Sequence, residues 1–76
     1  MYRFLVIIEP GPNNYSAYVP DLPGCIATGK ALEEVEQNMR DAISMHIEGM
    51  LEDNEPIPPS SSLAEYVDVP SPTSAA

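Results

Sequence analysis

Two prolines and a glycine close together constrain this chain more than any other feature. They lie in the run Val19-Pro20-Asp21-Leu22-Pro23-Gly24-Cys25. A residue that precedes proline favours extended backbone, so Val19 and Leu22 are expected to be extended. Gly24 can adopt backbone angles that are closed to other residues, which lets the chain reverse tightly. The run therefore predicts a structural turn between two short strands.

Strand-like segments surround this turn. Tyr2 to Glu9 is apolar at odd and even positions alike, as expected of a central strand. Pro10 to Asn14 cannot continue a ladder and predicts a hairpin loop. The second strand is expected from Tyr15 to Pro20 and the third from Cys25 to Thr28.

The period of the apolar residues then changes from two to 3.6, which predicts a helix from Ala31 to Glu52. Its apolar stripe consists of Leu32, Val35, Met39, Ala42, Ile43, His46, Ile47, Met50 and Leu51. Residues 57–62 predict a loop, and Leu63 to Val69 has the composition of a fourth strand. We therefore expect one domain over residues 1–69, followed by a disordered tail over residues 70–76.

The order of these elements, β-β-β-α-β, predicts an α+β fold. The simplest assembly has three antiparallel strands, after which the helix crosses one face and returns the fourth strand parallel to the first by a right-handed crossover. The first strand then lies in the middle of a four-stranded mixed sheet with the spatial order 3-2-1-4.

One helix covers only one face of such a sheet, yet the first strand is apolar on both faces. Phe4, Val6 and Ile8 point one way, and Leu5 and Ile7 point the other way. Monomers rarely leave a large apolar patch in water, so we expect a homo-oligomer, a dimer or tetramer, with two-fold symmetry. The interface would use the open sheet face or an exposed strand edge.

The net charge of the protein limits the classes of molecule that it can bind. Twelve acidic and three basic residues give a net charge of −9. Nucleic-acid affinity depends on Lys and Arg contacts to phosphates, so we expect no direct binding of DNA or RNA. An acidic surface suits a basic protein partner, whose approach it accelerates. The plainer interpretation is that the charge only keeps a small protein soluble.

A family resemblance follows from these residues. Tyr18 to Cys25, then Leu32-Glu33-Glu34-Val35, then Glu55 to Pro59 resemble the HicB antitoxin family over about residues 2–69. The resemblance implies a truncated RNase H-like fold in a bacterial protein. It also implies a function: binding and occlusion of a small basic HicA-type toxin, a ribonuclease that cleaves mRNA.

The chain departs from the family pattern in two places. Many HicB antitoxins carry a C-terminal DNA-binding segment, whereas only a tail rich in Pro, Ser and Ala follows the fourth strand here. We therefore do not expect this chain alone to repress transcription. Relatives commonly have Ser or Thr where this chain has Ala31, so the helix lacks its capping hydroxyl, at a cost of about 1 kcal/mol.

No residue pattern predicts catalysis, a metal site or a cofactor. Glu9 and Asp21 could suggest a two-metal nuclease site, but Asp21 is more simply a turn residue that bonds its own backbone. His46, the only histidine, is expected to pack at the edge of the helix stripe. Cys25, the only cysteine, is expected to be a small buried hydrophobe.

Three functional classes remain: an antitoxin or a solitary relative of one, a homo-oligomeric regulatory or scaffold module without a toxin, and a degenerate nuclease, which is the least favoured. A gene for a small basic protein beside this one would separate the first class from the second. The residues expected to bind a partner or another copy are Leu5, Ile7, Tyr18, Asp21, Leu22, Glu33 and Glu36. The apolar run of residues 4–8 is too short to span a bilayer, and we expect a cytoplasmic protein.

Overall fold

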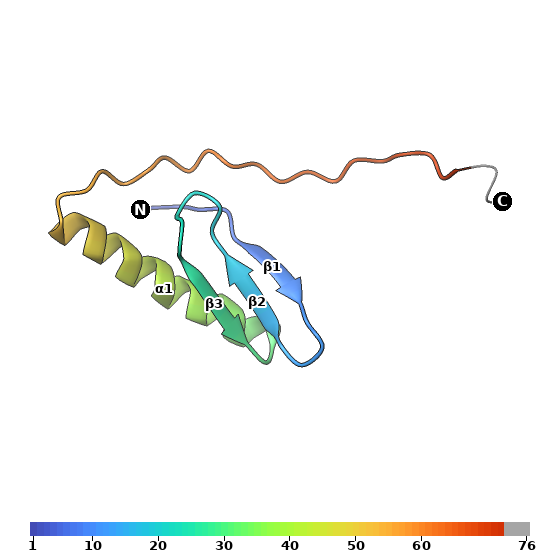
Figure 1. Cartoon of the computed structure of the whole chain (residues 1–76), viewed down its shortest axis with the longest axis horizontal. Coiled ribbons are helices and arrows are strands. Elements are labelled where there is room, and N and C mark those ends of the chain that lie inside the picture. The colour runs from blue at the N-terminus through green and yellow to red at the C-terminus, as the bar shows by residue number, and fades with distance from the viewer. Residues whose placement is uncertain (73–76) are drawn as a thin grey trace.

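A computed structural model describes residues 1–72 and shows a three-stranded sheet packed on one helix (Figure 1). The strands are β1 (Ile7–Pro10), β2 (Tyr15–Tyr18) and β3 (Ile26–Gly29), and the helix is α1 (Leu32–Glu52). The strands pair antiparallel in the order β1-β2-β3. The predicted α+β class, the three antiparallel strands and the long helix after them are confirmed.

A turn connects β2 and β3 at the predicted position. Gly24 has a φ of 85°, a region that residues with a Cβ rarely adopt. The N–H of Leu22 donates to the carbonyl of Val19 (3.1 Å), and the N–H of Cys25 donates to the carbonyl of Leu22 (3.0 Å). The N–H of Val19 then donates to the carbonyl of Cys25 at 3.2 Å, which closes the base of the turn.

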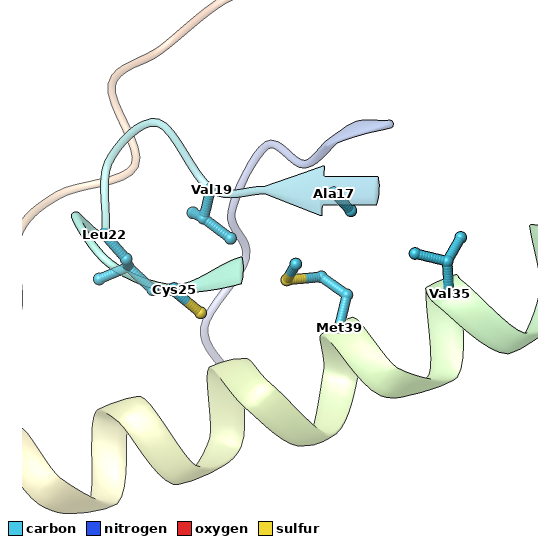
Figure 2. Packing of buried hydrophobic residues seen from close by; sticks show 6 residues of the cluster. All are labelled: Ala17, Val19, Leu22, Cys25, Val35 and Met39. Carbon is cyan, nitrogen blue, oxygen red and sulfur yellow. The ribbon is translucent and has the colours of Figure 1, made fainter. Parts of the chain in front are cut away.

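The core forms where this turn and β2 meet the helix. Val35 and Met39 point from α1 toward the sheet, and Leu22 lies beneath the turn (Figure 2). Leu22 and Val35 are 0% exposed and Met39 is 2% exposed. The core cluster is completed by Ala17, Val19 and Cys25. The turn is therefore part of the core as well as a connection between strands.

The helix ends are stabilised by different means. Ala31 at the N-terminus makes no side-chain cap, as its sequence predicts. The carboxylate of Glu34 instead accepts a hydrogen bond from the N–H of Lys30. At the C-terminus Asn54 adopts a φ of 57° and donates its N–H to the carbonyl of Leu51 (3.2 Å), which gives a left-handed helix stop.

The prediction of a fourth strand is wrong for the residues that the structure describes. Residues 55–72 are extended but pair with no strand, so neither the order 3-2-1-4 nor a truncated RNase H-like sheet is observed. The run Pro56-Ile57-Pro58-Pro59 supplies few backbone donors. The carboxylate of Asp21 also holds Ser61 and Ser62 at the β2–β3 turn.

The first strand and the helix stripe are also shorter than predicted. β1 begins at Ile7, so residues 2–6 precede the ladder. Leu32 and Leu51, at the two ends of the predicted stripe, are 46% and 54% exposed. The reason is length: α1 spans about 31 Å at 1.5 Å per residue, whereas strands of this size span about 13 Å. The sheet cannot cover both ends of the helix.

Gly29 joins the sheet to the helix and provides a stability test. A Cβ at this position would lie 2.5 Å from the backbone nitrogen of Val35, so Gly29→Ala should lower the free energy of unfolding by roughly 2–3 kcal/mol. Gly49→Ala is the matched control, because a Cβ there meets open space and should stabilise the helix by about 0.5–1 kcal/mol. Urea denaturation of both variants measures the difference. Equal stability of the two variants would show that the approach of Val35 to Gly29 is not tight.

Candidate functional site: the open sheet face and the β1 edge

The sheet face opposite the helix carries a row of apolar side chains. Ile7 pairs with Tyr18, and Tyr18 pairs with Ile26, so one row crosses all three strands. Tyr18 is 42% exposed and Ile26 is 69% exposed. We call Ile7, Tyr18 and Ile26 the open-face patch. An uncovered apolar row on a sheet is typical of a protein-binding surface.

A second surface lies on the helix side of β1. α1 packs over β3 and β2, because only a short connection separates β3 from the helix (Figure 1). β1 therefore extends beyond the part of the sheet that the helix covers. The result is a groove of about 430 Å³. We call it the β1 groove, and its lining is Tyr2, Phe4, Val6, Ile8, Met39 and Ile43 together with Arg3, Glu36 and Arg40. Two of the three basic residues of the chain thus line one apolar groove.

The two edges of the sheet differ in accessibility. The side-chain amide of Asn38 on α1 donates to the carbonyl of Thr28 in β3 at 2.8 Å. Gly29, at the end of the same strand, lies against Val35. The helix therefore occupies the Thr28–Gly29 end of the β3 edge. On the other side no strand within residues 1–72 pairs with the outer edge of β1. The β1 edge can therefore accept a further strand.

Asp21 ties the C-terminal segment to the turn. Its Oδ2 accepts the backbone N–H groups of Ser61 and Ser62, both at 3.0 Å. Its Oδ1 accepts the hydroxyls of the same two serines, at 3.3 Å and 2.8 Å. We call these four hydrogen bonds the Asp21 latch. The expectation that Asp21 bonds its own turn is wrong, because its partners lie 40 and 41 residues away.

The structure brings three of the expected site residues to the open side of the sheet. Ile7 and Tyr18 form part of the open-face patch, and Leu5 lies just before β1 in a shallow groove beside the C-terminal segment. Ile26 was missed, although the burial of Cys25 beside it could have indicated it, since neighbouring strand residues point to opposite faces.

The other expected residues have separate positions. Leu22 is fully buried, so it supports the turn from inside and its side chain cannot touch a partner in this conformation. Glu33 is exposed in the first turn of α1, and Glu36 is exposed one turn later at the β1 groove.

Cys25 has the environment expected of a buried thiol. It is 3% exposed, and burial raises the pKa of the Cys25 thiol, which disfavours the reactive thiolate. His46 is half-buried at the helix surface, in a shallow depression with Cys25 and Met45. Within residues 1–72 no three His, Cys, Asp or Glu side chains gather closely enough to hold a metal ion. Over the same residues, no helix has both the length and the apolar composition needed to span a membrane.

Comparison with known proteins identifies the family. A family model described as the HicB-like antitoxin of bacterial toxin–antitoxin systems matches residues 4–75. The chain belongs to the HicB-like antitoxin family. Among solved structures, the chain resembles one from a HicA3 and HicB3 toxin–antitoxin complex, with a TM-score of 0.61 and 23% identity. The match covers 80% of this chain and 72% of that one, and it shows that the two share a fold.

Curated relatives of this HicB-like chain include a phage protein and a bacterial protein. It is 45% identical over 65 residues to an uncharacterized 14.9 kDa protein from the rep-hol intergenic region of Haemophilus phage HP1. The match covers 86% of the chain and 49% of the phage protein, so the chain spans about half the length of that relative. It is also 34% identical over 59 residues to a UPF0150 protein of Synechocystis, covering 76% of this chain and 75% of that protein.

The Asp21 latch predicts a pH-dependent release of the C-terminal segment. Hydrogen bonds from Ser62, and then from Ser61, hold the pKa of the Asp21 carboxyl below its usual value of 3.8. Because the folded pKa is depressed, the latch should stabilise the folded chain fully above pH 3.8 and be lost as pH falls through the lower folded value. Asp21→Ala should release the segment at neutral pH.

Amide hydrogen exchange at Ser61 and Ser62 measures this release. Exchange at both amides should be faster in Asp21→Ala than in the wild-type protein at pH 7. Asp68→Ala is the matched control, because Asp68 is exposed outside the latch. Unchanged exchange in Asp21→Ala would show that the segment does not depend on this carboxylate.

Proposed function

We propose that this chain acts as an antitoxin that binds and occludes a small basic toxin of the HicA type, an mRNA-cleaving ribonuclease. Family membership supports the antitoxin role, and the fold shared with a chain of a HicA–HicB complex supports the kind of partner. The observation that carries the proposal is an uncovered apolar row, the open-face patch, on a protein with a net charge of −9.

Charge and apolar surface would have separate roles in binding. A strongly acidic protein attracts a basic partner from a distance and raises the association rate. The open-face patch then supplies side chains whose removal from water holds the partner, with Tyr18 as the aromatic anchor. Glu9 lies one row from the patch on the same face of the sheet. Glu33 and Glu36 lie on α1, on the other side of the sheet, so they would contribute only to the long-range attraction. Inhibition is steric, because the antitoxin covers the basic surface that the toxin needs for RNA.

The expected site residues enter this proposal with different roles. Ile7 and Tyr18 would touch the toxin directly, together with Ile26, and Leu5 would extend the contact. Glu33 and Glu36, on the helix side, would contribute to the long-range attraction and not to the contact itself. Asp21 and Leu22 would act indirectly, since Asp21 holds the C-terminal segment and Leu22 supports the turn from the core. The protein has no catalytic role in this scheme, and we place it in the cytoplasm with its mRNA-cleaving partner.

Self-association is the second part of the proposal. The open-face patch and the free β1 edge are surfaces that a second copy can cover, and a chain of this size gains stability from added burial. A homo-oligomeric regulatory module without a toxin would use the same surfaces. The absence of any interacting small basic protein would favour that alternative function.

The antitoxin proposal can be tested with a small basic HicA-type protein encoded beside this chain. Purified wild-type protein should stop that protein from cleaving RNA, and added salt should weaken their association because the attraction is electrostatic. Tyr18→Ala should weaken association at least about tenfold, as expected for an aromatic anchor. Binding is measured by titration calorimetry and inhibition by an RNA-cleavage assay.

The matched control is Met45→Ala, which removes an exposed apolar side chain from α1, outside the open-face patch. It should bind as the wild-type protein does. If Tyr18→Ala and Met45→Ala bind equally well, the open-face patch is not the contact. If the wild-type protein neither binds nor inhibits the basic protein, the antitoxin function is wrong.

A further inference from the structure

The C-terminal segment has the features of a strand without a partner. Beyond Pro59 the chain runs extended across the end of the sheet and continues past it (Figure 1). Leu63, Val67 and Val69 occupy odd positions, on one side of the extended segment, and are 88%, 74% and 77% exposed. Tyr66 occupies an even position, on the other side. Folded proteins normally pair or cover an extended apolar segment of this kind, because its unpaired backbone and side chains promote association.

The Asp21 latch anchors the start of the segment at the β2–β3 turn, where it pairs with no strand. Ser60, Ser62, Leu63 and Ala64 lie beside residues 3–6, in the groove that also contains Leu5. The latch fixes Ser61 and Ser62 at the β2–β3 turn, so the chain leaves the body from there. The β1 groove, on the helix side of the same residues 3–6, remains open.

The outer edge of β1 is ready to accept a strand. The N–H of Gly11 donates to the carbonyl of Asn14 at 2.7 Å, and hydrogen-bonded and non-hydrogen-bonded pairs alternate from that point along an antiparallel ladder. By this alternation Ile8 lies in a non-hydrogen-bonded pair, so its N–H and C=O point outward. Pro10, the other such residue in β1, has no N–H to leave unpaired.

The segment and the β1 groove match in length and chemistry. Residues 63–69 extend over about 23 Å at 3.3 Å per residue, as do residues 3–9 at the receiving edge. If Leu63, Val67 and Val69 face the groove, alternation also points Glu65 into it. The groove is apolar and contains Arg3 and Arg40, with one like charge from Glu36. An acidic residue between apolar residues therefore meets two arginines and one carboxylate.

We propose that residues 63–69 of one copy add as a strand to the β1 edge of a second copy and fill its β1 groove, and that the second copy does the same in return. Two-fold symmetry lets each chain donate one segment and accept one, which closes the assembly and pairs both β1 edges. This inference rests on the self-association proposed above and names the segment and edge that carry it. It is independent of toxin binding.

A proline in the segment tests the exchange without disturbing the core. Val67→Pro removes a backbone donor from an exposed residue, so dimer affinity should fall at least about tenfold. Val67→Thr keeps the donor and a β-branched side chain, so its affinity should stay within about threefold of the wild-type value. Sedimentation equilibrium at micromolar concentration measures the mass against that of the 8.3 kDa chain.

Hydrogen exchange provides the second measurement. The Ile8 amide should be protected increasingly as protein concentration rises in the wild-type protein, and this dependence should disappear in Val67→Pro. Added salt should strengthen the dimer, because two chains of charge −9 repel each other. A basic toxin should show the opposite salt dependence.

Two results would overturn the inference. A wild-type chain that stays at 8.3 kDa would show that no second copy accepts the segment. A Val67→Pro variant that dimerises as tightly as the wild type would place self-association on another surface, such as the open-face patch. RNA-cleavage assays on the same variants test the antitoxin proposal separately. A monomeric Val67→Pro protein should still inhibit the toxin, so loss of the dimer and loss of inhibition are distinguishable.

Discussion

The contact of α1 with one face of the sheet determines the rest of this structure. Val35 and Met39 reach from the helix to Ala17 in β2 and to Leu22 and Cys25 around the turn. All five side chains are at most 3% exposed. Because this single cluster supplies most of the burial in a small domain, the helix must stay over β2, β3 and their turn. Gly29 allows the close approach of Val35 that places it there.

The available surfaces follow from that position. A helix held over β3 and β2 cannot also cover β1, so a groove opens between β1 and Ile43 on the helix. A helix on one face leaves the row from Ile7 to Ile26 uncovered on the other. The side chain of Asn38 occupies the Thr28 carbonyl at the β3 edge, whereas no strand within residues 1–72 pairs with the β1 edge. The apolar surfaces on which the two proposals rest are therefore consequences of how the core packs.

The sequence predicted the parts of the fold that depend on local pattern. Proline and glycine chemistry predicted the turn, and periodicity predicted α1 to within one residue at its start. Leu63 to Val69 was predicted as a strand from composition, but strand formation needs a partner edge, which local sequence does not specify. The Asp21 latch joins residues 40 positions apart, so no short-range pattern could indicate it. The alternation of side chains along the strands identified Ile7 and Tyr18 as partner-binding residues. The position of β1 relative to the helix depends on tertiary packing, which local sequence does not show.

The central claim is that a partner binds the sheet on the side away from the helix while the helix–sheet core stays intact. Amide hydrogen exchange on the full chain, with and without the cognate basic protein, tests this claim most directly. The account predicts slower exchange in β1 and β2 around Ile7 and Tyr18, with no change at Val35 and Met39 in the core. Protection confined to α1, with β1 and β2 unaffected, would contradict it.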